Sequence, residues 1–339
     1  MIIAVANADI FTPAWWLPGP HLQAVGARLL RRRGGVRYQR ERIELPDGDF
    51  VDLDWVVEVA GRRASEKAPL VLVLHGLEGS SASDYVLSTH RALARHGIAA
   101  AALNFRSCSG EPNRLPRFYH SGDTGDIAAA IAHIGGRFPD RQLGAVGFSL
   151  GGNALLKYLG ERGGDGQEDS LPHAAVAISV PFDLSAGIST LEQGLGPLYQ
   201  RYFLRRLRRK VRDKRAVLDG NVDVDALLAV RTLRDFDDLG TAPLHGFADS
   251  GDYYRRSSSK PFLPSIRVPT LLIHAIDDPF LPPSAVPRAE VAANPHVEAT
   301  FPAHGGHVGF VSGPAWAPVF WAERTAAGFL AERLCGRSG

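Results

Sequence analysis

One serine of the sequence lies in a setting that suits nucleophilic catalysis. Ser149 is the central residue of Gly147-Phe148-Ser149-Leu150-Gly151, a G-x-S-x-G string that follows an apolar run and opens a helical one. In that context the string is typical of a sharp strand-to-helix turn that presents the serine hydroxyl at the end of a sheet. Such a hydroxyl becomes a nucleophile when a histidine takes its proton and an acid orients the histidine. The sequence therefore predicts acyl-transfer chemistry at Ser149, provided that an acid and a base follow.

An acid and a base do follow the serine, in the chain order that this chemistry uses on an α/β sheet. Asp277 and Asp278 come directly after an apolar run. Asp278 is the preferred acid because it lies in the loop just past the strand, and Asp277 is the alternative. Of His304 and His307, which two glycines separate, His307 is the preferred base because the glycines let its loop fold back over the serine. His304 is the alternative, and we expect a triad of Ser149, Asp278 and His307.

Backbone N–H groups near the serine complete this chemistry. The oxyanion of acyl transfer needs hydrogen-bond donors, commonly from the residue after the nucleophile and from the loop after an earlier strand. Leu150 occupies the first position, and Leu77, in the glycine-rich loop at residues 75–79, occupies the second. We expect the N–H groups of Leu77 and Leu150 to form the oxyanion hole. The reaction requires neither a metal ion nor an organic cofactor.

Short apolar runs alternate with amphipathic stretches and place these residues at the ends of strands. Continuous apolar runs of strand length are typical of strands buried on both faces of a parallel sheet. Strands are predicted at residues 70–74, 98–105, 143–148, 174–180, 270–276 and 298–301, and helices at residues 83–96, 123–134, 150–159 and 315–334. Residues 36–45 and 50–57 predict a leading hairpin around a turn. The pattern favours an α/β fold whose mostly parallel central sheet is covered by helices on both faces.

The strand and helix alternation stops between residues 181 and 264. Apolar residues at helical spacing between residues 199 and 211 favour an inserted helical cap over the alternative, a long disordered loop. We predict an N-terminal arm at residues 1–35 that packs on the core. The core itself is predicted at residues 36–180 and 265–339, with the cap insertion at residues 181–264.

Composition narrows the class of protein further. The 339 residues carry 38 Lys and Arg against 36 Asp and Glu, and a net charge of +2 gives no argument for a nucleic-acid partner. Two cysteines, Cys108 and Cys335, cannot build a disulfide framework or a Cys-rich zinc site and are expected to be free thiols. No stretch approaches the ~18 apolar residues of a membrane span. Because the start also lacks a basic targeting region, we expect a soluble, cytoplasmic protein.

Several strings of the sequence resemble one family. The chain is similar to the YheT-like branch of the α/β-hydrolases, which includes plant embryogenesis-associated proteins and mammalian abhydrolase-domain lipid enzymes. The matching strings span nearly the whole chain and are Pro20-His21-Leu22-Gln23, His75-Gly76-Leu77-Glu78-Gly79-Ser80, Asn104-Phe105-Arg106-Ser107-Cys108-Ser109-Gly110, Tyr119-His120-Ser121-Gly122, Gly147-Phe148-Ser149-Leu150-Gly151-Gly152-Asn153, Asp277-Asp278-Pro279 and Gly305-Gly306-His307-Val308-Gly309-Phe310. One departure is Ala275, where many relatives carry glycine.

The resemblance implies an α/β-hydrolase fold and a serine hydrolase that cleaves carboxylic esters with Ser149, Asp278 and His307. Substrates of the family range from short acyl esters to phospholipids, so a small ester or a lipid ester is the expected partner. Two alternatives remain. One is an acyltransferase, phospholipase or thioesterase that uses the same triad, and the other is a binding protein that kept the fold without catalysis.

Two surface features have an ordinary and a functional interpretation. Residues 201–215 contain nine basic residues and one acid. We interpret them first as a solvated helix face, with attraction of anionic lipid as the alternative. Trp15, Trp16, Leu17 and Leu22 are interpreted first as packing of the N-terminal arm, with membrane or acyl-chain contact as the alternative.

Overall fold

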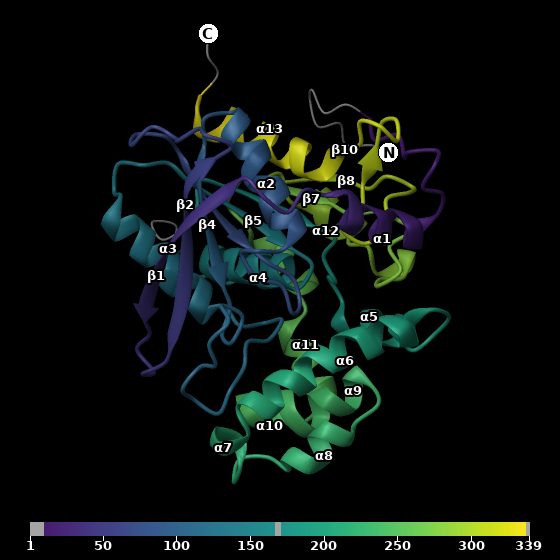
Figure 1. The fold of residues 1–339 in the computed structure, drawn as a ribbon. Helices are drawn as coiled ribbons and strands as arrows, with labels where there is room; N and C mark the ends of the chain where they lie inside the picture. Colours follow the sequence, from purple (N-terminus) through teal and green to yellow (C-terminus); the bar gives the residue numbers. More distant parts are fainter. Residues whose placement is uncertain (1–9, 167–170, 337–339) are drawn as a thin grey trace.

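The computed structural model describes residues 10–166 and 171–336. The strands of its central sheet are β1 (Val36–Glu44), β2 (Phe50–Val59), β3 (Leu70–Leu74), β4 (Ala99–Asn104), β5 (Leu143–Phe148), β6 (Ala174–Ile178), β7 (Thr270–Ile273) and β8 (Val297–Thr300). They lie in the order β1-β2-β4-β3-β5-β6-β7-β8 (Figure 1). β2 pairs antiparallel with β1 and β4, and the other neighbours are parallel. The predicted mostly parallel sheet with a leading hairpin is confirmed.

Helices cover both faces of this sheet (Figure 1). They are α2 (Asp84–Arg95), α3 (Gly125–Arg137), α4 (Leu150–Gly164), α12 (Arg288–Ala293) and α13 (Trp321–Leu334). The apolar run of β3 explains the arrangement, because successive side chains of a strand point to opposite faces. Leu70, Leu72 and Leu74 pack in the cluster that contains α3 and α4. Val71 and Val73 pack in the cluster that contains α2 and α13.

The closing helix is shorter than the sequence indicates. It was predicted from residue 315, but α13 begins at Trp321. Instead, β9 (Val311–Ser312) and β10 (Val319–Phe320) form a second, two-stranded sheet. Pro318 accounts for the difference, because the residue before a proline is disfavoured in helical backbone.

The segment between β6 and β7 is helical. It contains α5 (Leu184–Leu191), α6 (Gly196–Asp213), α7 (Arg215–Leu218), α8 (Val224–Ala229), α9 (Leu233–Phe236), α10 (Ala242–His245) and α11 (Ser250–Ser257), with a π-helical turn at Asp237–Thr241 and a 3-10 turn at Lys260–Ser265. Leu204 and Val211 of α6 lie in an apolar cluster with Leu227 and Phe236. In Figure 1 α6 to α10 form a group below the sheet. The division of the chain at residues 181 and 264 stays a prediction.

The N-terminal part packs on the core through α1 (Pro20–Leu30). Gln23 is buried, and its side chain accepts a hydrogen bond from the Val311 N–H (2.8 Å) while its amide donates to the carbonyls of Leu17 and Val311. Trp16 and Leu17 belong to a small apolar cluster here, as the packing interpretation expects. Trp15 does not follow that expectation, since 84% of it is exposed.

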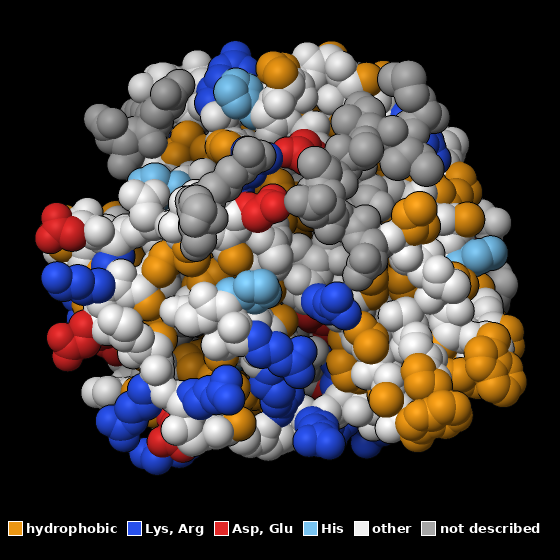
Figure 2. All heavy atoms as spheres, turned by 90° about the horizontal axis from the view of Figure 1, so that it is seen from above, with side chains coloured by type: hydrophobic (Ala, Val, Ile, Leu, Met, Phe, Trp, Pro, Cys, Tyr) orange, Lys and Arg blue, Asp and Glu red, His pale blue; other side chains and the backbone are white. Residues whose placement is uncertain are grey.

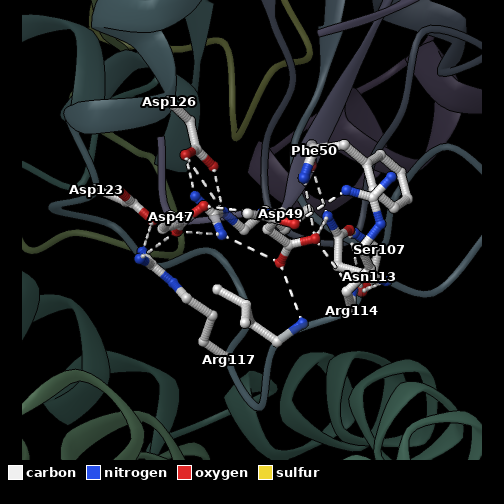
Figure 3. A network of polar contacts seen from close by, with 12 residues as sticks. Asp47, Asp49, Phe50, Ser107, Asn113, Arg114, Arg117, Asp123 and Asp126 are labelled. Carbon is white, nitrogen blue, oxygen red and sulfur yellow. Dashed lines mark hydrogen bonds and ion pairs between the residues drawn. The ribbon is translucent and has the colours of Figure 1, made fainter. Parts of the chain in front are cut away.

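A buried ionic network fastens the β1–β2 turn to the core (Figure 3). In Figure 3 Asp47, Asp49 and Asp126 point toward one another. All three carboxylates pair with the guanidinium of Arg106, whose side chain is 3% exposed. The shortest contacts of Arg106 are 2.7 Å to Asp126, 2.8 Å to Asp47 and 3.1 Å to Asp49. Asp49 also accepts hydrogen bonds from Asn113 and from backbone N–H groups. The network joins the turn, the loop after β4 and the first turn of α3.

Replacing Arg106 by methionine should lower the free energy of unfolding by about 3–5 kcal/mol, because buried carboxylates would lose their cation. Urea unfolding followed by circular dichroism measures this. Arg215→Met is the control, since Arg215 pairs with Asp225 at the surface, where 46% and 78% of the two side chains are exposed. The control should unfold like the unmodified protein. Equal stability of the two variants would show that the ion pairs of Arg106 do not stabilise the fold.

Candidate active site

The turn that carries Ser149 joins β5 to α4 and depends on two glycines. Ser149 has φ 51° and ψ −119°, a backbone conformation that residues other than glycine rarely adopt. A Cβ atom at Gly147 would lie 2.6 Å from the Gly151 carbonyl oxygen, and one at Gly151 would lie 2.5 Å from the His75 carbonyl oxygen. Strand and helix therefore approach more closely than any larger residue permits. The turn places the half-buried Ser149 hydroxyl at the carboxyl end of the sheet.

His307 and Asp278 lie in line with that hydroxyl. The His307 Nε2 atom is 3.0 Å from Ser149 Oγ, and its Nδ1 atom is 2.8 Å from Asp278 Oδ2. Although burial alone raises the pKa of Asp278, the neighbouring His307 and a hydrogen bond from the Phe280 N–H hold that pKa below its ordinary value. An ionised Asp278 accepts only, so Nδ1 carries the imidazole proton and Nε2 can accept the one from the serine.

Two residues that the sequence analysis did not single out hold this imidazole. The ring of Phe280 stacks on that of His307 with centroids 4.1 Å apart. Ser179 accepts a hydrogen bond from the Val308 N–H at 2.9 Å, beside the histidine. Phe280 and Ser179 are both distant from His307 in the sequence, and no sequence motif predicts either contact.

The alternative acid and base pair with each other away from the serine. Asp277 Oδ2 lies 3.2 Å from His304 Nδ1, and 64% of the His304 side chain is exposed. Asp277 Oδ1 also accepts a hydrogen bond from the Gly306 N–H at 2.9 Å. Among the residues that the structure describes, no hydrogen bond joins Asp277 or His304 to Ser149. Asp277 instead fastens the loop that leads to His307.

Helix α1 packs directly on the histidine loop. A Cβ atom at Gly306 would lie 2.2 Å from the Pro20 carbonyl oxygen, and one at Gly309 would lie 2.9 Å from that of Gln23. The two strings around Gln23 and His307, which both carried the family resemblance, therefore form one contact. Nothing in the two strings themselves predicts that they lie together.

Of the two residues predicted to supply oxyanion donors, Leu150 directly follows Ser149 and Leu77 lies in the loop that contacts it. Gly76, next to Leu77, is so close that a Cβ atom there would lie 3.1 Å from Ser149 Cβ. Its N–H donates to the Tyr85 hydroxyl at 2.9 Å, which fixes the start of the loop. Within residues 10–166 and 171–336, the N–H groups of Leu77 and Leu150 donate to no backbone carbonyl. Both therefore remain available for a ligand.

Glu78, the next residue of this loop, is held by four hydrogen bonds from other segments, which the sequence did not indicate. Its φ is 58°. Its N–H donates to the Tyr119 hydroxyl (2.6 Å), and its carbonyl accepts from Arg206 (2.9 Å). Its carboxylate lies 2.7 Å from Lys210 Nζ and 3.1 Å from the Tyr119 hydroxyl. Arg206 and Lys210 belong to the basic run of α6, so part of that run positions the loop beside Ser149.

A cleft of about 700 Å³ opens from Ser149 and His307. Its walls come from α1, the loop after β3 and α6, and many of the side chains that line it are apolar or aromatic. A second cavity of about 100 Å³ lies beside Leu77 and Leu150, under α5 and α6. The space next to the serine can therefore hold a ligand much larger than a water molecule.

Cys108 and Cys335 are both free. Within the described part of the chain, no group of three or more histidine, cysteine or acidic side chains could hold a metal ion. No helix in the described ranges is long and apolar enough to cross a membrane.

Comparison with known proteins gives concordant matches. The family described as "alpha/beta hydrolase fold" matches residues 69–314. The chain is 41% identical over 330 residues to "Putative esterase YheT" of Escherichia coli (strain K12), with 97% of this chain and 95% of that protein covered. It is 30% identical over 308 residues to "Phospholipase ABHD3" of Mus musculus, with 90% of this chain and 74% of that protein covered. The solved structure of the Pyrococcus furiosus esterase Pf2001 superposes with a TM-score of 0.55 at 18% identity, covering 88% of this chain and 92% of that one.

Proposed function

The chain belongs to the α/β-hydrolase family, in its YheT-like branch, and from that premise we propose that it is a serine hydrolase that cleaves carboxylic esters through an acyl-enzyme on Ser149. The observation that carries the proposal is the line of contacts from Ser149 Oγ to His307 Nε2 (3.0 Å) and from His307 Nδ1 to Asp278 (2.8 Å). The names of the relatives, an esterase and a phospholipase, support the same class of reaction.

In the proposed reaction Ser149 Oγ attacks the acyl carbon of the ester while its proton passes to His307 Nε2. The bond from the acyl carbon to the alcohol oxygen then breaks, and His307 returns the proton to the leaving alcohol. Water next attacks the acyl-enzyme, gives a proton to His307 and releases the acid, and the proton returns to Ser149. Asp278 stabilises the imidazolium that forms in each half-reaction.

The N–H groups of Leu77 and Leu150 are the proposed donors to the oxyanion of both tetrahedral intermediates. Gly76 brings the first of these residues against Ser149, and the N-terminus of α4 supplies the second. Fixed backbone donors need no rearrangement during the reaction, which makes this kind of stabilisation large.

A lipid ester is the substrate class that the cleft favours. Its volume of about 700 Å³ exceeds what a short acyl ester fills, and Tyr199, Tyr202 and Phe203 of α6 line it together with Val25 of α1. The name of the mouse relative supports a phospholipid in particular. An acyltransferase would use the same acyl-enzyme and would differ only in the acceptor.

Labelling with a fluorophosphonate probe tests the nucleophile. The unmodified protein should be labelled, and a folded Ser149→Ala variant should not be. Ser65→Ala is the control, because Ser65 is exposed and distant from the site in the chain. Labelling of the Ser149→Ala variant, or no labelling of the folded unmodified protein, would overturn the proposal. Release of free acid from p-nitrophenyl and phospholipid esters then separates hydrolysis from transfer.

A further inference from the structure

Large apolar side chains are exposed at the mouth of the cleft. Of the eleven exposed large hydrophobic residues of the described chain, six lie on α1, on α6 or directly before α6. We call these six residues the rim. They are Leu22 (50% exposed), Val25 (48%), Leu29 (75%), Leu195 (50%), Leu198 (64%) and Tyr202 (37%). Their concentration in two helices sets them apart from scattered apolar surface residues, which need no explanation.

The two halves of the rim belong to one opening. Val25, Leu195, Leu198 and Tyr202 line the same cleft as Ser149. The helices also touch there, since His21 Nδ1 of α1 lies 2.9 Å from the Tyr199 hydroxyl of α6. The Arg28 guanidinium lies 5.0 Å from the centre of the Tyr202 ring. Four of the six rim residues therefore line the path to the serine, and Leu22 and Leu29 lie beside it on α1.

The charge around the rim is of one sign. Helix α1 contains no acidic residue, and α6 contains one, Asp213, at its last position. Arg31 is buried and paired with Asp84 and Glu323, and Arg208 is half-buried and donates to the Val230 carbonyl, but the other arginines here are exposed. The exposed arginines are Arg28, Arg32, Arg33, Arg201, Arg205, Arg206, Arg209 and Arg212. Figure 2, which views the molecule from above Figure 1, shows basic and hydrophobic side chains gathered beside one another along its lower edge.

We infer that the rim docks on the surface of an anionic phospholipid membrane and that substrate enters the cleft from that surface. Apolar side chains on an amphipathic face insert at the boundary of headgroups and acyl chains, while neighbouring arginines attract anionic headgroups. A protein bound to the rim would close the mouth of the cleft, whereas a lipid surface would supply substrate to it. The inference deepens the proposed function and rests on it only for the entry of substrate.

Vesicle sedimentation with the full chain tests the docking. The Ser149→Ala variant is used, so that no lipid is consumed. Binding to vesicles of phosphatidylcholine with phosphatidylglycerol should exceed binding to phosphatidylcholine alone by about tenfold or more, because each basic residue near an anionic surface adds attraction. Adding Leu22→Glu and Leu29→Glu to this variant should lower its binding to the anionic vesicles by at least about tenfold. Neither leucine lines the cleft.

Three further measurements test whether the loss of vesicle binding is specific to the rim and its arginines. Leu239→Glu is the matched control, since Leu239 is 43% exposed, lies outside both helices and should leave binding unchanged. Arg201→Glu with Arg205→Glu should weaken binding to the anionic vesicles alone. In the active protein, the Leu22 and Leu29 substitutions should leave hydrolysis of a soluble p-nitrophenyl ester unchanged, which also shows that the variant folds.

Equal binding to both kinds of vesicle, or unchanged binding after the Leu22 and Leu29 substitutions, would overturn the docking surface. A dimer in solution that these substitutions convert to a monomer would overturn it too, because a second copy of the chain would then cover the rim. Vesicle binding without any ester hydrolysis would leave the docking standing and would refute the proposed function instead.

Discussion

Replacing Asp278 by asparagine should lower kcat for ester hydrolysis by about four orders of magnitude, with little change in stability. Asp278 is 4% exposed and accepts from His307 Nδ1 at 2.8 Å and from the Phe280 N–H at 2.9 Å. An asparagine amide has nearly the same shape, but it carries no charge to stabilise the imidazolium and can donate a hydrogen bond to Nδ1. The proton would then be held at Nε2, and the serine would lose its base. Steady-state kinetics with a p-nitrophenyl ester measures the effect.

The neighbouring Asp277→Asn is the matched control for this experiment. Asp277 contacts His304 and accepts from the Gly306 N–H, and the asparagine oxygen can accept the second of these bonds. We therefore expect kcat to change by no more than a few fold. A larger loss in Asp277→Asn than in Asp278→Asn would show that Asp277, and not Asp278, is the acid.

The sequence predicted the parts of the fold that local rules determine. The runs of β3, β5 and β6 are apolar at nearly every position because both faces of the sheet are covered, and this pattern is readable without coordinates. The G-x-S-x-G string is readable for a similar reason, because its glycines are required by contacts within the turn and with β3. By contrast, α13 was extended too far: Pro318 disfavours helical backbone at the residue before it, and Val319 and Phe320 pair with β9 instead.

The choice between Asp277 and Asp278, and between His304 and His307, depended on contacts between residues that are distant in the sequence. Asp277 and Asp278 are adjacent in sequence, yet their side chains leave the end of β7 in different directions, one toward Gly306 and one toward His307. The preference for Asp278 came from its position in the loop and from the family resemblance. Sequence periodicity could not predict the packing of α1 on the loop that contains His307, or the hydrogen bonds from α6 to Glu78.

The hydrogen bonds from α6 to Glu78 predict a large effect at Lys210, a residue that does not line the cleft opening from Ser149. Lys210→Met should lower the free energy of unfolding by about 3–5 kcal/mol, because it leaves the buried Glu78 carboxylate without its cation. Burial by itself lowers the pKa of Lys210, but the nearby Cys108 and Glu78 raise it above its ordinary value, so the amine is charged. Glu78 follows Leu77 and has a φ of 58°. Release of its carboxylate should let the loop relax and move the Leu77 N–H.

The catalytic part of this prediction is a fall in kcat of about 10²–10³-fold, the usual effect of losing one oxyanion donor, with a smaller change in KM. Glu78→Gln combined with Lys210→Met removes both charges and keeps side chains of similar size, so it should regain most of the lost stability. Unfolding and kinetics of the two single variants and the double variant form a double-mutant cycle. A purely structural salt bridge would change the stability and leave kcat unchanged, and in that case α6 would have no part in positioning the loop beside Ser149.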